Sequence, residues 1–164
     1  MPAARLVQDP SFEETLHHAR NAGLKVGVYF FTQAVTEDEA REEAQGCNWV
    51  LNGRKLDYPI YYDTEASTSP NGTGRADGLG KEDRTNVPSP SARKSSRWGT
   101  SRCVRFHHLV PQAGGPGRLR KYTIWNAHYG VSSSPIDCDM WQGTEKARIN
   151  GYSGELDANI SYMG

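Results

Sequence analysis

The stretch Leu24–Phe31 reads LKVGVYFF, eight residues rich in β-branched and aromatic side chains. This length and composition predict a buried β-strand. Apolar residues at helical spacing predict a helix before it, over Pro10–Ala22, and another after it, over Glu37–Leu51. A second strand, PIYYDTE, is predicted at Pro59–Glu65. Helix, strand, helix and strand at this short spacing indicate an α/β protein with parallel strands, whose ligand sites lie at the carboxyl ends of the strands.

Residues that begin and end helices flank both predicted helices. Asp9 is the expected N-cap of the first helix, with a proline at the first helical position, and Gly23 is the expected stop. Thr36 and Glu39 have the spacing of a capping box before the second helix, which is expected to stop at Gly53. Three further strands are expected towards the C-terminus, and the first of them should join the same sheet: Tyr122–Tyr129, Cys138–Gln142 and Leu156–Ser161.

Between Asn86 and Arg120 the sequence changes character. These 35 residues contain no Asp or Glu and seven basic residues, so the segment has a charge of +7 and the rest of the chain has −7. The segment also has four prolines, a serine-rich run and no apolar period of a helix or a strand. We therefore expect an irregular, insert-like segment at 86–120.

The overall composition argues against several classes of protein. The 19 basic and 19 acidic side chains balance, which argues against a dedicated nucleic-acid binder. No apolar run reaches the roughly 18 residues of a membrane span, and the sequence shows no signal peptide. Three cysteines without a C-x-x-C pair, and histidines without ligand spacing, predict neither a metal site nor a cofactor. A soluble protein without nucleic-acid or membrane partners is expected.

The second predicted strand carries two carboxylates, Asp63 and Glu65. At positions i and i+2 of a strand they point to the same face, with Cβ atoms roughly 6–7 Å apart. In a cleft, mutual repulsion would keep a proton on one of them, and a protonated acid beside an ionised carboxylate can cleave a glycosidic bond. The leaving oxygen needs a proton, while the developing oxocarbenium ion needs a negative charge nearby. Such D-x-E pairs also occur on ordinary surfaces, so the pair alone leaves both interpretations open.

Five segments, taken in order and spacing, carry a resemblance to a known family. They are VGVYFFTQA (Val26–Ala34), YPIYYDTEAS (Tyr58–Ser67), YTIWNAHYG (Tyr122–Gly130), DMWQGT (Asp139–Thr144) and GELDANISY (Gly154–Tyr162). Together they resemble the glycoside hydrolase family 25 lysozymes, the N-acetylmuramidases of the Chalaropsis and phage-lysin type. The resemblance covers roughly Gln8–Thr85 and Lys121–Tyr162.

The resemblance implies a TIM-like (β/α) barrel that hydrolyses the β-1,4 bond between N-acetylmuramic acid and N-acetylglucosamine in peptidoglycan. Carried over by position, Glu65 is similar to the general acid, and Asp63 to the carboxylate that orients or charge-stabilises the reacting sugar. Asp157 is similar to the family's acidic residue on the last strand, although a helix or turn cap would also explain it. Five residues are expected to bind substrate at the barrel mouth: Tyr61, Trp125, Tyr129, Trp141 and Gln142. Core packing would explain Trp125 equally well.

Two departures from the family pattern change the expected fold. The family begins with a strand that bears an aspartate, and with a second strand before the helix that here starts at Asp9, whereas only eight residues precede Asp9. We therefore expect an N-terminally truncated, incomplete barrel that lacks the first strands and one active-site carboxylate. The other departure is the basic segment 86–120, which stands where the family has a helix, a strand and a following helix.

The genetic code suggests that the basic segment is a reading-frame artefact. Joining the last base of each codon to the first two bases of the next, Asn86–Thr100 permits ERAVAFCEEIKSLGY, an amphipathic helix ending in a strand start. In the remaining frame, Cys103–Arg118 permits VYASTTWFRKLVDLDD. Both strings resemble the missing family segment, so we predict a frameshifted segment at about 86–120. On this hypothesis the histidines and the cysteine of that segment have no metal or thiol role.

Three functions follow in order of preference. The first is a lysozyme-type muramidase formed by one domain over residues 1–164, with little activity in this chain because of its two departures. The second is a non-catalytic glycan-binding remnant that keeps the aromatic cleft, and the third is a nucleic-acid binder that uses the basic segment. The first reading implies peptidoglycan glycan strands as the partner, a monomer, and action outside the cell or at the cell wall.

Overall fold

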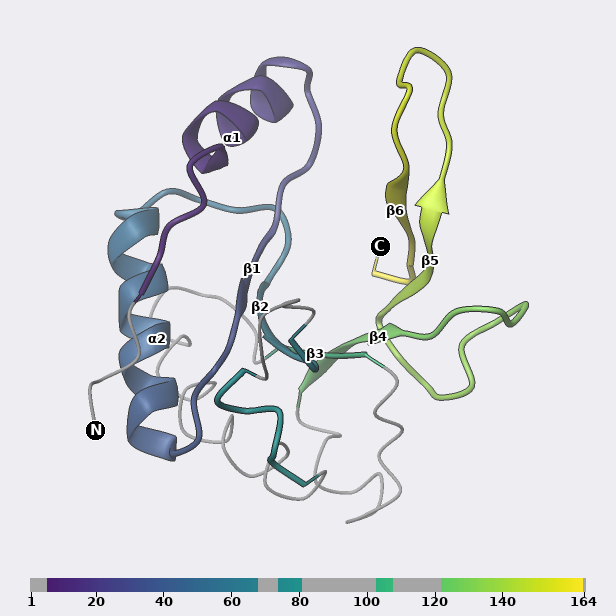
Figure 1. Cartoon of the computed structure of the whole chain (residues 1–164). Helices are drawn as coiled ribbons and strands as arrows, with labels where there is room; N and C mark the ends of the chain where they lie inside the picture. Colours follow the sequence, from purple (N-terminus) through teal and green to yellow (C-terminus); the bar gives the residue numbers. More distant parts are fainter. Residues whose placement is uncertain (1–5, 68–73, 81–102, 108–121, 164) are drawn as a thin grey trace.

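The computed structural model describes residues 6–67, 74–80, 103–107 and 122–163 (Figure 1). Its elements, in chain order, are α1 (Phe12–Asn21), β1 (Val28–Phe31), α2 (Glu37–Leu51), β2 (Ile60–Thr64), β3 (Cys103–His107), β4 (Thr123–Ala127), β5 (Met140–Ala147) and β6 (Leu156–Ser161). The strands form one sheet in sequence order, β1 to β6. Neighbours from β1 to β5 are parallel, and β6 is antiparallel to β5. The predicted α/β class with parallel strands is confirmed.

The first strand is shorter than predicted because the residues before it serve a turn. The carbonyl oxygen of Val26 accepts from the backbone N–H groups of Asp57 (2.8 Å) and Tyr58 (3.0 Å). In return, the Asp57 carboxylate accepts from the Val26 N–H at 2.9 Å. A Cβ on Gly27 would lie 2.7 Å from the Tyr58 Cβ, so only glycine allows this approach. Regular pairing with β2 therefore starts at Val28.

Helix α1 begins later than predicted. Its N-cap is Ser11, and Asp9 instead accepts hydrogen bonds from the Ser11 N–H and hydroxyl, each at 2.8 Å. The prediction of Asp9 as the N-cap is therefore wrong by two residues, because the carboxylate closes an Asx-type turn ahead of the helix. The predicted stop at Gly23 is confirmed, with φ +72° in the left-handed region.

Helix α2 has the predicted bounds. The Thr36 hydroxyl accepts from the Glu39 N–H (3.3 Å), while the Glu39 carboxylate reaches back to the Val35 N–H (2.8 Å). The helix ends at Asn52, which is left-handed with φ 45°, and the predicted face around Ala40 and Ala44 is buried. Neither helix in the described part of the chain is long and apolar enough to cross a membrane.

Strand β3 corrects the expectation of an irregular segment from 86 to 120. Its five residues pair in parallel with β2 on one side and with β4 on the other, so the strand occupies the middle of the sheet. Pairing between strands uses backbone N–H and C=O groups and needs no particular side chain. The facing edges of β2 and β4 supply these groups, so a segment without an apolar period can form a strand between them. The remaining residues of the basic segment lie outside the described ranges, so the reading-frame hypothesis stays a prediction.

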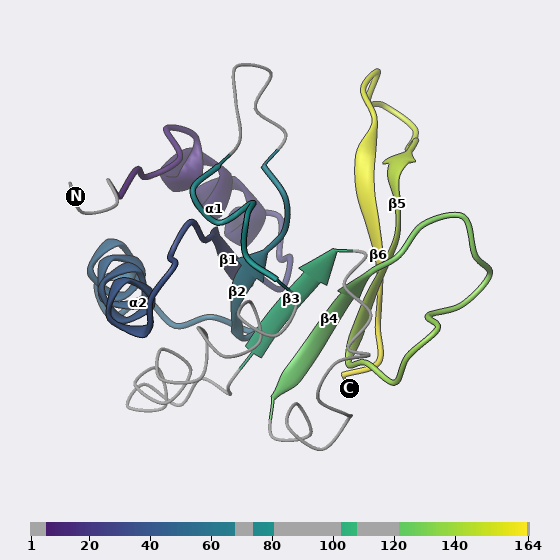
Figure 2. The same ribbon diagram turned by 60° about the horizontal axis from the view of Figure 1, so that its bottom comes forward.

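The sheet has two different faces. One face packs against α2 and the loop before it, where Phe30, Tyr62 and Ile124 surround Ala34 and Ala40. Figure 2 shows both helices at the β1 end of the sheet and the β5–β6 hairpin at the opposite end. The opposite face carries the alternate residues of the same strands, among them Tyr29, Tyr61 and Trp125.

The sheet is strongly curved toward that second face. The ring centroids of Tyr29 on β1 and Trp125 on β4 are 5.9 Å apart, although β2 and β3 lie between these strands. In a flat sheet, strands three places apart would be separated by about 14 Å. The contact therefore requires the sheet to curl, so that side chains from distant strands meet on its concave face.

Candidate active site on the concave face

Two carboxylates lie where β2 ends. Asp63 is the fourth residue of β2 and is 1% exposed, and Glu65, directly after the strand, is partly exposed. Strand alternation places Asp63 on the face that carries Tyr61, and Glu65 follows one residue past the end of the strand. The register aligns Asp63 with Phe31 of β1 and with the third residue of β3, at the carboxyl edge of the parallel strands. This edge is where parallel α/β folds place their ligand sites.

Aromatic rings lie beside the carboxylates on the concave face. The rings of Tyr61 and Trp125 meet edge to face with centroids 5.1 Å apart. The Trp125 indole N–H donates to the Asn159 side-chain oxygen of β6 at 2.8 Å. A ring held from two sides in this way presents a fixed, partly exposed surface.

Tyr129 is fixed by Gln142. The Gln142 side chain is 1% exposed and donates from Nε2 to the Tyr129 hydroxyl at 2.9 Å, and its backbone oxygen accepts from the His128 N–H at 3.1 Å. The predicted pair of Tyr129 and Gln142 is therefore in direct contact. Tyr129 lies two residues beyond the end of β4, on the carboxyl side of the sheet.

Trp141 does not lie where it was expected. The register pairs it with Asn126, on the opposite face of β5 from Gln142 and opposite the face of Trp125. Its side chain is 5% exposed and the indole N–H donates to the His128 backbone oxygen at 2.9 Å. The expectation that Trp141 faces the mouth is thus corrected: one-residue alternation on β5 admits either Trp141 or Gln142 on the concave face, and the structure has Gln142 there.

Asp157 stands apart from the other carboxylates in the sheet. It is exposed on β6, and three strands separate β6 from β2. Its neighbours Leu156 and Ala158 pair with Ala147 and Thr144, beyond the part of β5 that pairs with β4. The structure therefore brings Tyr61, Asp63 and Trp125 onto one surface and leaves Asp157 on the projecting hairpin.

A buried carboxylate that the sequence analysis missed lies behind β1. Glu43 of α2 is 6% exposed, its Oε2 is 2.5 Å from the Thr32 hydroxyl, and its Oε1 accepts from the Gln33 N–H at 3.2 Å. The same Thr32 hydroxyl is 2.9 Å from the Tyr62 hydroxyl. Burial raises the pKa of the Glu43 carboxyl, against the opposing effect of the Thr32 and Gln33 hydrogen bonds. Its spacing from Ala40 and Ala44 already places it on the apolar face of α2.

Thr32 links this carboxylate to the strand that carries Asp63. The Thr32 N–H donates to the Asp63 backbone oxygen at 2.9 Å, which extends the β1–β2 pairing by one residue. A hydroxyl group has one hydrogen and can donate to one acceptor. When Glu43 is ionised, the Thr32 hydroxyl donates to its carboxylate, and the Tyr62 hydroxyl donates to the Thr32 oxygen. The network holds the carboxyl end of β1 against α2.

A second missed residue, Asp77, closes the loop that follows Glu65. Its carboxylate accepts from the N–H groups of Ser67 (2.8 Å) and Gly74 (2.6 Å). The neighbouring Ala76 N–H donates to the Gln33 side-chain oxygen at 3.1 Å, which ties the loop to the end of β1.

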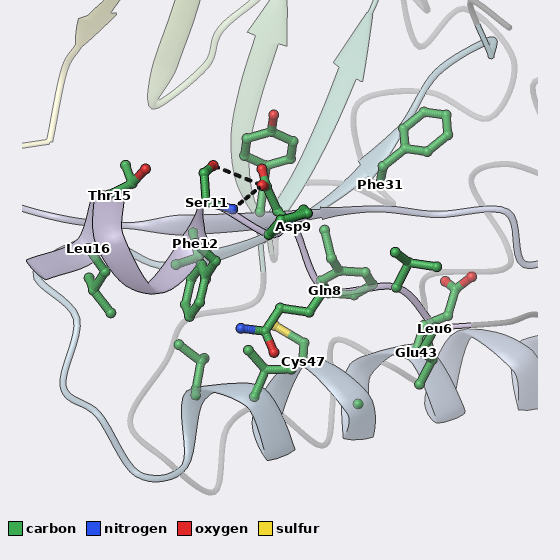
Figure 3. A pocket seen from close by; sticks show the side chains of 18 of the residues that line it. Leu6, Gln8, Asp9, Ser11, Phe12, Thr15, Leu16, Phe31, Glu43 and Cys47 are labelled. Carbon is green, nitrogen blue, oxygen red and sulfur yellow. Dashed lines mark hydrogen bonds between the residues drawn. The ribbon is translucent and has the colours of Figure 1, made fainter.

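A cavity of about 1390 Å³ lies away from the carboxylate pair. It runs along the outer edge of β1, between α1 and α2, and neither Asp63 nor Glu65 lines it. Figure 3 shows Phe12 of α1, Phe31 of β1, and Glu43 and Cys47 of α2 around it. Burial raises the pKa of the Cys47 thiol to about 11, which keeps it neutral and unreactive at neutral pH. Within the described residues, no group of three His, Cys, Asp or Glu side chains is arranged to hold a metal ion.

The curved, mainly parallel sheet thus carries carboxylates and aromatic rings toward the carboxyl ends of its strands, where parallel α/β folds place their ligand sites. The family model of the Glycosyl hydrolases family 25 matches residues 4–152, and the chain belongs to this family. A curated relative, the autolytic lysozyme of Clostridium acetobutylicum, is 25% identical over 155 residues, which is 91% of this chain. The chain spans 43% of that relative's length.

Solved structures share the fold. The spore cortex lytic enzyme SleM of Clostridium perfringens has a TM-score of 0.77 at 20% identity, covering 96% of this chain and 55% of that one. The bacterial lysozyme from Streptomyces coelicolor has a TM-score of 0.69 at 23% identity, covering 95% and 76%. The modular autolysin LytC from Streptococcus pneumoniae, in complex with a synthetic peptidoglycan ligand, has a TM-score of 0.75 at 19% identity, covering 93% and 37%.

Proposed function

We propose that this chain carries the site of a muramidase, which hydrolyses the β-1,4 bond between N-acetylmuramic acid and N-acetylglucosamine in peptidoglycan. The observation that carries the proposal is the pair Asp63 and Glu65, at the carboxyl end of β2, in a member of glycosyl hydrolase family 25. Asp63 is buried and Glu65 is partly exposed, so Glu65 is the carboxylate of the pair that a substrate reaches more easily.

In the proposed reaction Glu65 gives its proton to the glycosidic oxygen as the bond to the anomeric carbon breaks. Asp63, close to the reacting sugar, stabilises the positive charge that develops on the ring and its N-acetyl group. Water then supplies a hydroxyl to the anomeric carbon and returns a proton to a carboxylate, so that the enzyme regains its starting state. Asp157 is proposed as a further acidic residue of the site, which requires the β5–β6 hairpin to approach β2.

The proposed substrate is a glycan strand of peptidoglycan. Trp125 and Tyr129, which are partly exposed, offer ring faces for sugar stacking, and Gln142 fixes Tyr129. Tyr61 is 2% exposed and is proposed to serve the substrate site by holding Trp125 edge to face. Trp141 is proposed to support the site through the His128 backbone and not to contact sugar. The proposed protein is a monomer that acts outside the cell or at the cell wall, without a cofactor and without nucleic-acid or membrane partners.

We also propose that residues 1–164 form one catalytic domain, an incomplete TIM-like barrel that is open beside β1. The curvature that brings Tyr29 to Trp125 is the curvature of a barrel wall, with the concave face toward the barrel interior, and supports this proposal. The apolar cavity along β1, the strand at the end of the described sheet, supports an opening there. Such an opening leaves a strand edge and apolar residues without cover, so this chain is expected to have low activity.

The test measures release of reducing ends from purified peptidoglycan. Glu65→Gln is isosteric and cannot donate a proton, so it should lower the rate by a factor of about 10²–10⁴. Glu42→Gln, at an exposed position of α2, is the matched control and should keep the rate of the parent. Equal rates for the Glu65 variant and the parent would show that Glu65 is not the general acid.

A second candidate function is glycan binding without cleavage. It is favoured by the Trp125–Asn159 and Tyr129–Gln142 contacts, which fix the aromatic rings without any contribution from Asp63 or Glu65. Retention on insoluble peptidoglycan with no release of reducing ends by the parent chain would favour this function over hydrolysis.

A further inference from the structure

The β5–β6 hairpin projects beyond the rest of the sheet (Figure 1). Gln142 is the last residue of β5 that pairs with β4, and β5 continues to Ala147 with β6 as its partner. Five residues at about 3.4 Å each carry the hairpin roughly 17 Å past the carboxyl edge of the β4–β5 pairing. The hairpin thus leads away from the edge at which the parallel strands end.

The tip of the hairpin has a defined shape. The Tyr152 N–H donates to the Ile149 carbonyl oxygen at 3.3 Å, and Gly151 between them is left-handed with φ +88°. Behind the turn, Arg148 and Glu155 form an ion pair at 3.3 Å. The pair is exposed and contributes little energy, but it joins the two arms of the hairpin next to the turn.

Tyr152 lies on the backbone of Gly154. A Cβ added to Gly154 would be 2.6–2.7 Å from three atoms at the outer end of the Tyr152 side chain, so the ring occupies the space that any other residue would fill. The side chain nevertheless remains 52% exposed. The ring is therefore supported on one side by a glycine and open to solvent elsewhere.

A supported, exposed ring suits one class of ligand. The C–H face of a pyranose packs on an aromatic face, while the hydroxyl and N-acetyl groups of an amino sugar need polar partners. Asn150 and Ser153 flank Tyr152 at the tip, and both are exposed.

We propose that Tyr152 is the centre of a second glycan-binding site at the hairpin tip, separate from the Asp63–Glu65 site. The inference rests on the proposed function, since its ligand is the same polymer. A glycan network offers many sugars to one protein molecule, so a second contact raises retention on the polymer without changing affinity for a short oligosaccharide. The hairpin tip would contact a distant part of the glycan strand that occupies the Asp63–Glu65 site, or a neighbouring glycan strand.

The test compares binding of the full chain to insoluble peptidoglycan with binding to a soluble chitotetraose. Tyr152→Ala should weaken retention on peptidoglycan by about tenfold, the scale of one important contact residue, and leave the chitotetraose affinity unchanged. Tyr152→Phe keeps the ring and should retain binding. Tyr162→Ala removes a tyrosine of similar exposure, 56%, away from the tip and is the matched control.

Gly154→Ala tests the support of the ring while keeping the tyrosine. The added methyl group displaces the far end of a flexible side chain, so the fold is kept and the ring moves, and retention should fall as in Tyr152→Ala. Gly78→Ala, where the new Cβ meets nothing within 4 Å, is its control.

Two results would overturn the inference. Unchanged retention in Tyr152→Ala and Gly154→Ala, with the parent chain still bound, would reject the tip site and leave the proposed function standing. Failure of the parent chain to bind either glycan would reject both.

Discussion

Glu43 shows how one buried carboxylate makes stability depend on pH. Burial raises its folded-state pKa above the ordinary value of 4.5, so the folded protein binds this proton more tightly than the unfolded chain does. The stabilising effect is fully present below about the unfolded-state pKa and is lost as the pH rises through the folded-state pKa. The free energy of unfolding should therefore fall over that interval.

Glu43→Gln should remove this fall. A glutamine amide can accept from the Gln33 N–H and donate to the Thr32 hydroxyl, so the variant should equal or exceed the parent at pH 7, and the difference should shrink at pH 4. Glu43→Ala leaves both groups without that partner and should cost about 2–3 kcal/mol. Urea unfolding at several pH values measures both, with the exposed Glu42→Gln as control. A loss in Glu43→Gln as large as in Glu43→Ala would contradict a raised pKa.

At the scale of single residues, the sequence predicted that Tyr61 and Asp63 share a face of the sheet. It did so because alternation along a strand is a local rule, which places Tyr61 and Asp63 on one face. The rule failed for Trp141, since alternation alone does not say which of two neighbouring residues faces inward. Thr32 and Asp77 were missed because their roles depend on partners far along the chain.

At the scale of elements, helix α2 and strand β6 have the predicted bounds, whereas α1 and β1 begin late. The end signals of α2 lie within its own sequence, in the Thr36–Glu39 box and at Asn52. The start of β1 is set by its contact with the turn before β2, which no local pattern reveals. Strand β3 was missed because its place is set by its two neighbours.

Gly27→Ala tests this long-range constraint on β1. The new Cβ would lie 2.7 Å from the Tyr58 Cβ and 3.4 Å from the Pro59 carbonyl oxygen, and neither a Cβ nor a backbone atom can move aside cheaply. We expect a loss of about 1–3 kcal/mol in the free energy of unfolding, measured by urea denaturation. Gly78→Ala, which meets open space, should be close to neutral. Equal stability of the two variants would show that the β1–turn contact is not tight in solution.

At the scale of the whole molecule, alternation of helices and strands predicted a parallel sheet, but nothing local predicted how far it curves. The edge-to-face contact of Tyr29 with Trp125 requires that curvature, and the cavity along β1 shows where packing is incomplete. The open cavity of about 1390 Å³ leaves its apolar lining without contacts that a packed neighbour would supply.

This chain should therefore be marginally stable. We expect a free energy of unfolding near or below about 5 kcal/mol, the lower end for natural domains, and binding of a hydrophobic dye under native conditions. Urea denaturation and dye fluorescence measure these two properties. A steep transition with a value near 10 kcal/mol, and no dye binding, would show that the β1 edge is covered in solution.

The spacing of paired strands along the chain also sets the order in which they pair during folding. Strands β5 and β6 are joined by a short turn, so they can meet after closing only a small loop. By contrast, β2 ends at Thr64 and its partner β3 begins at Cys103, so this pairing must bring distant parts of the chain together. The hairpin is thus a fast-forming nucleus, and the strand that holds the carboxylate pair acquires its second neighbour late. When the full-length chain refolds, the C-terminal hairpin should therefore form before β2 pairs with β3.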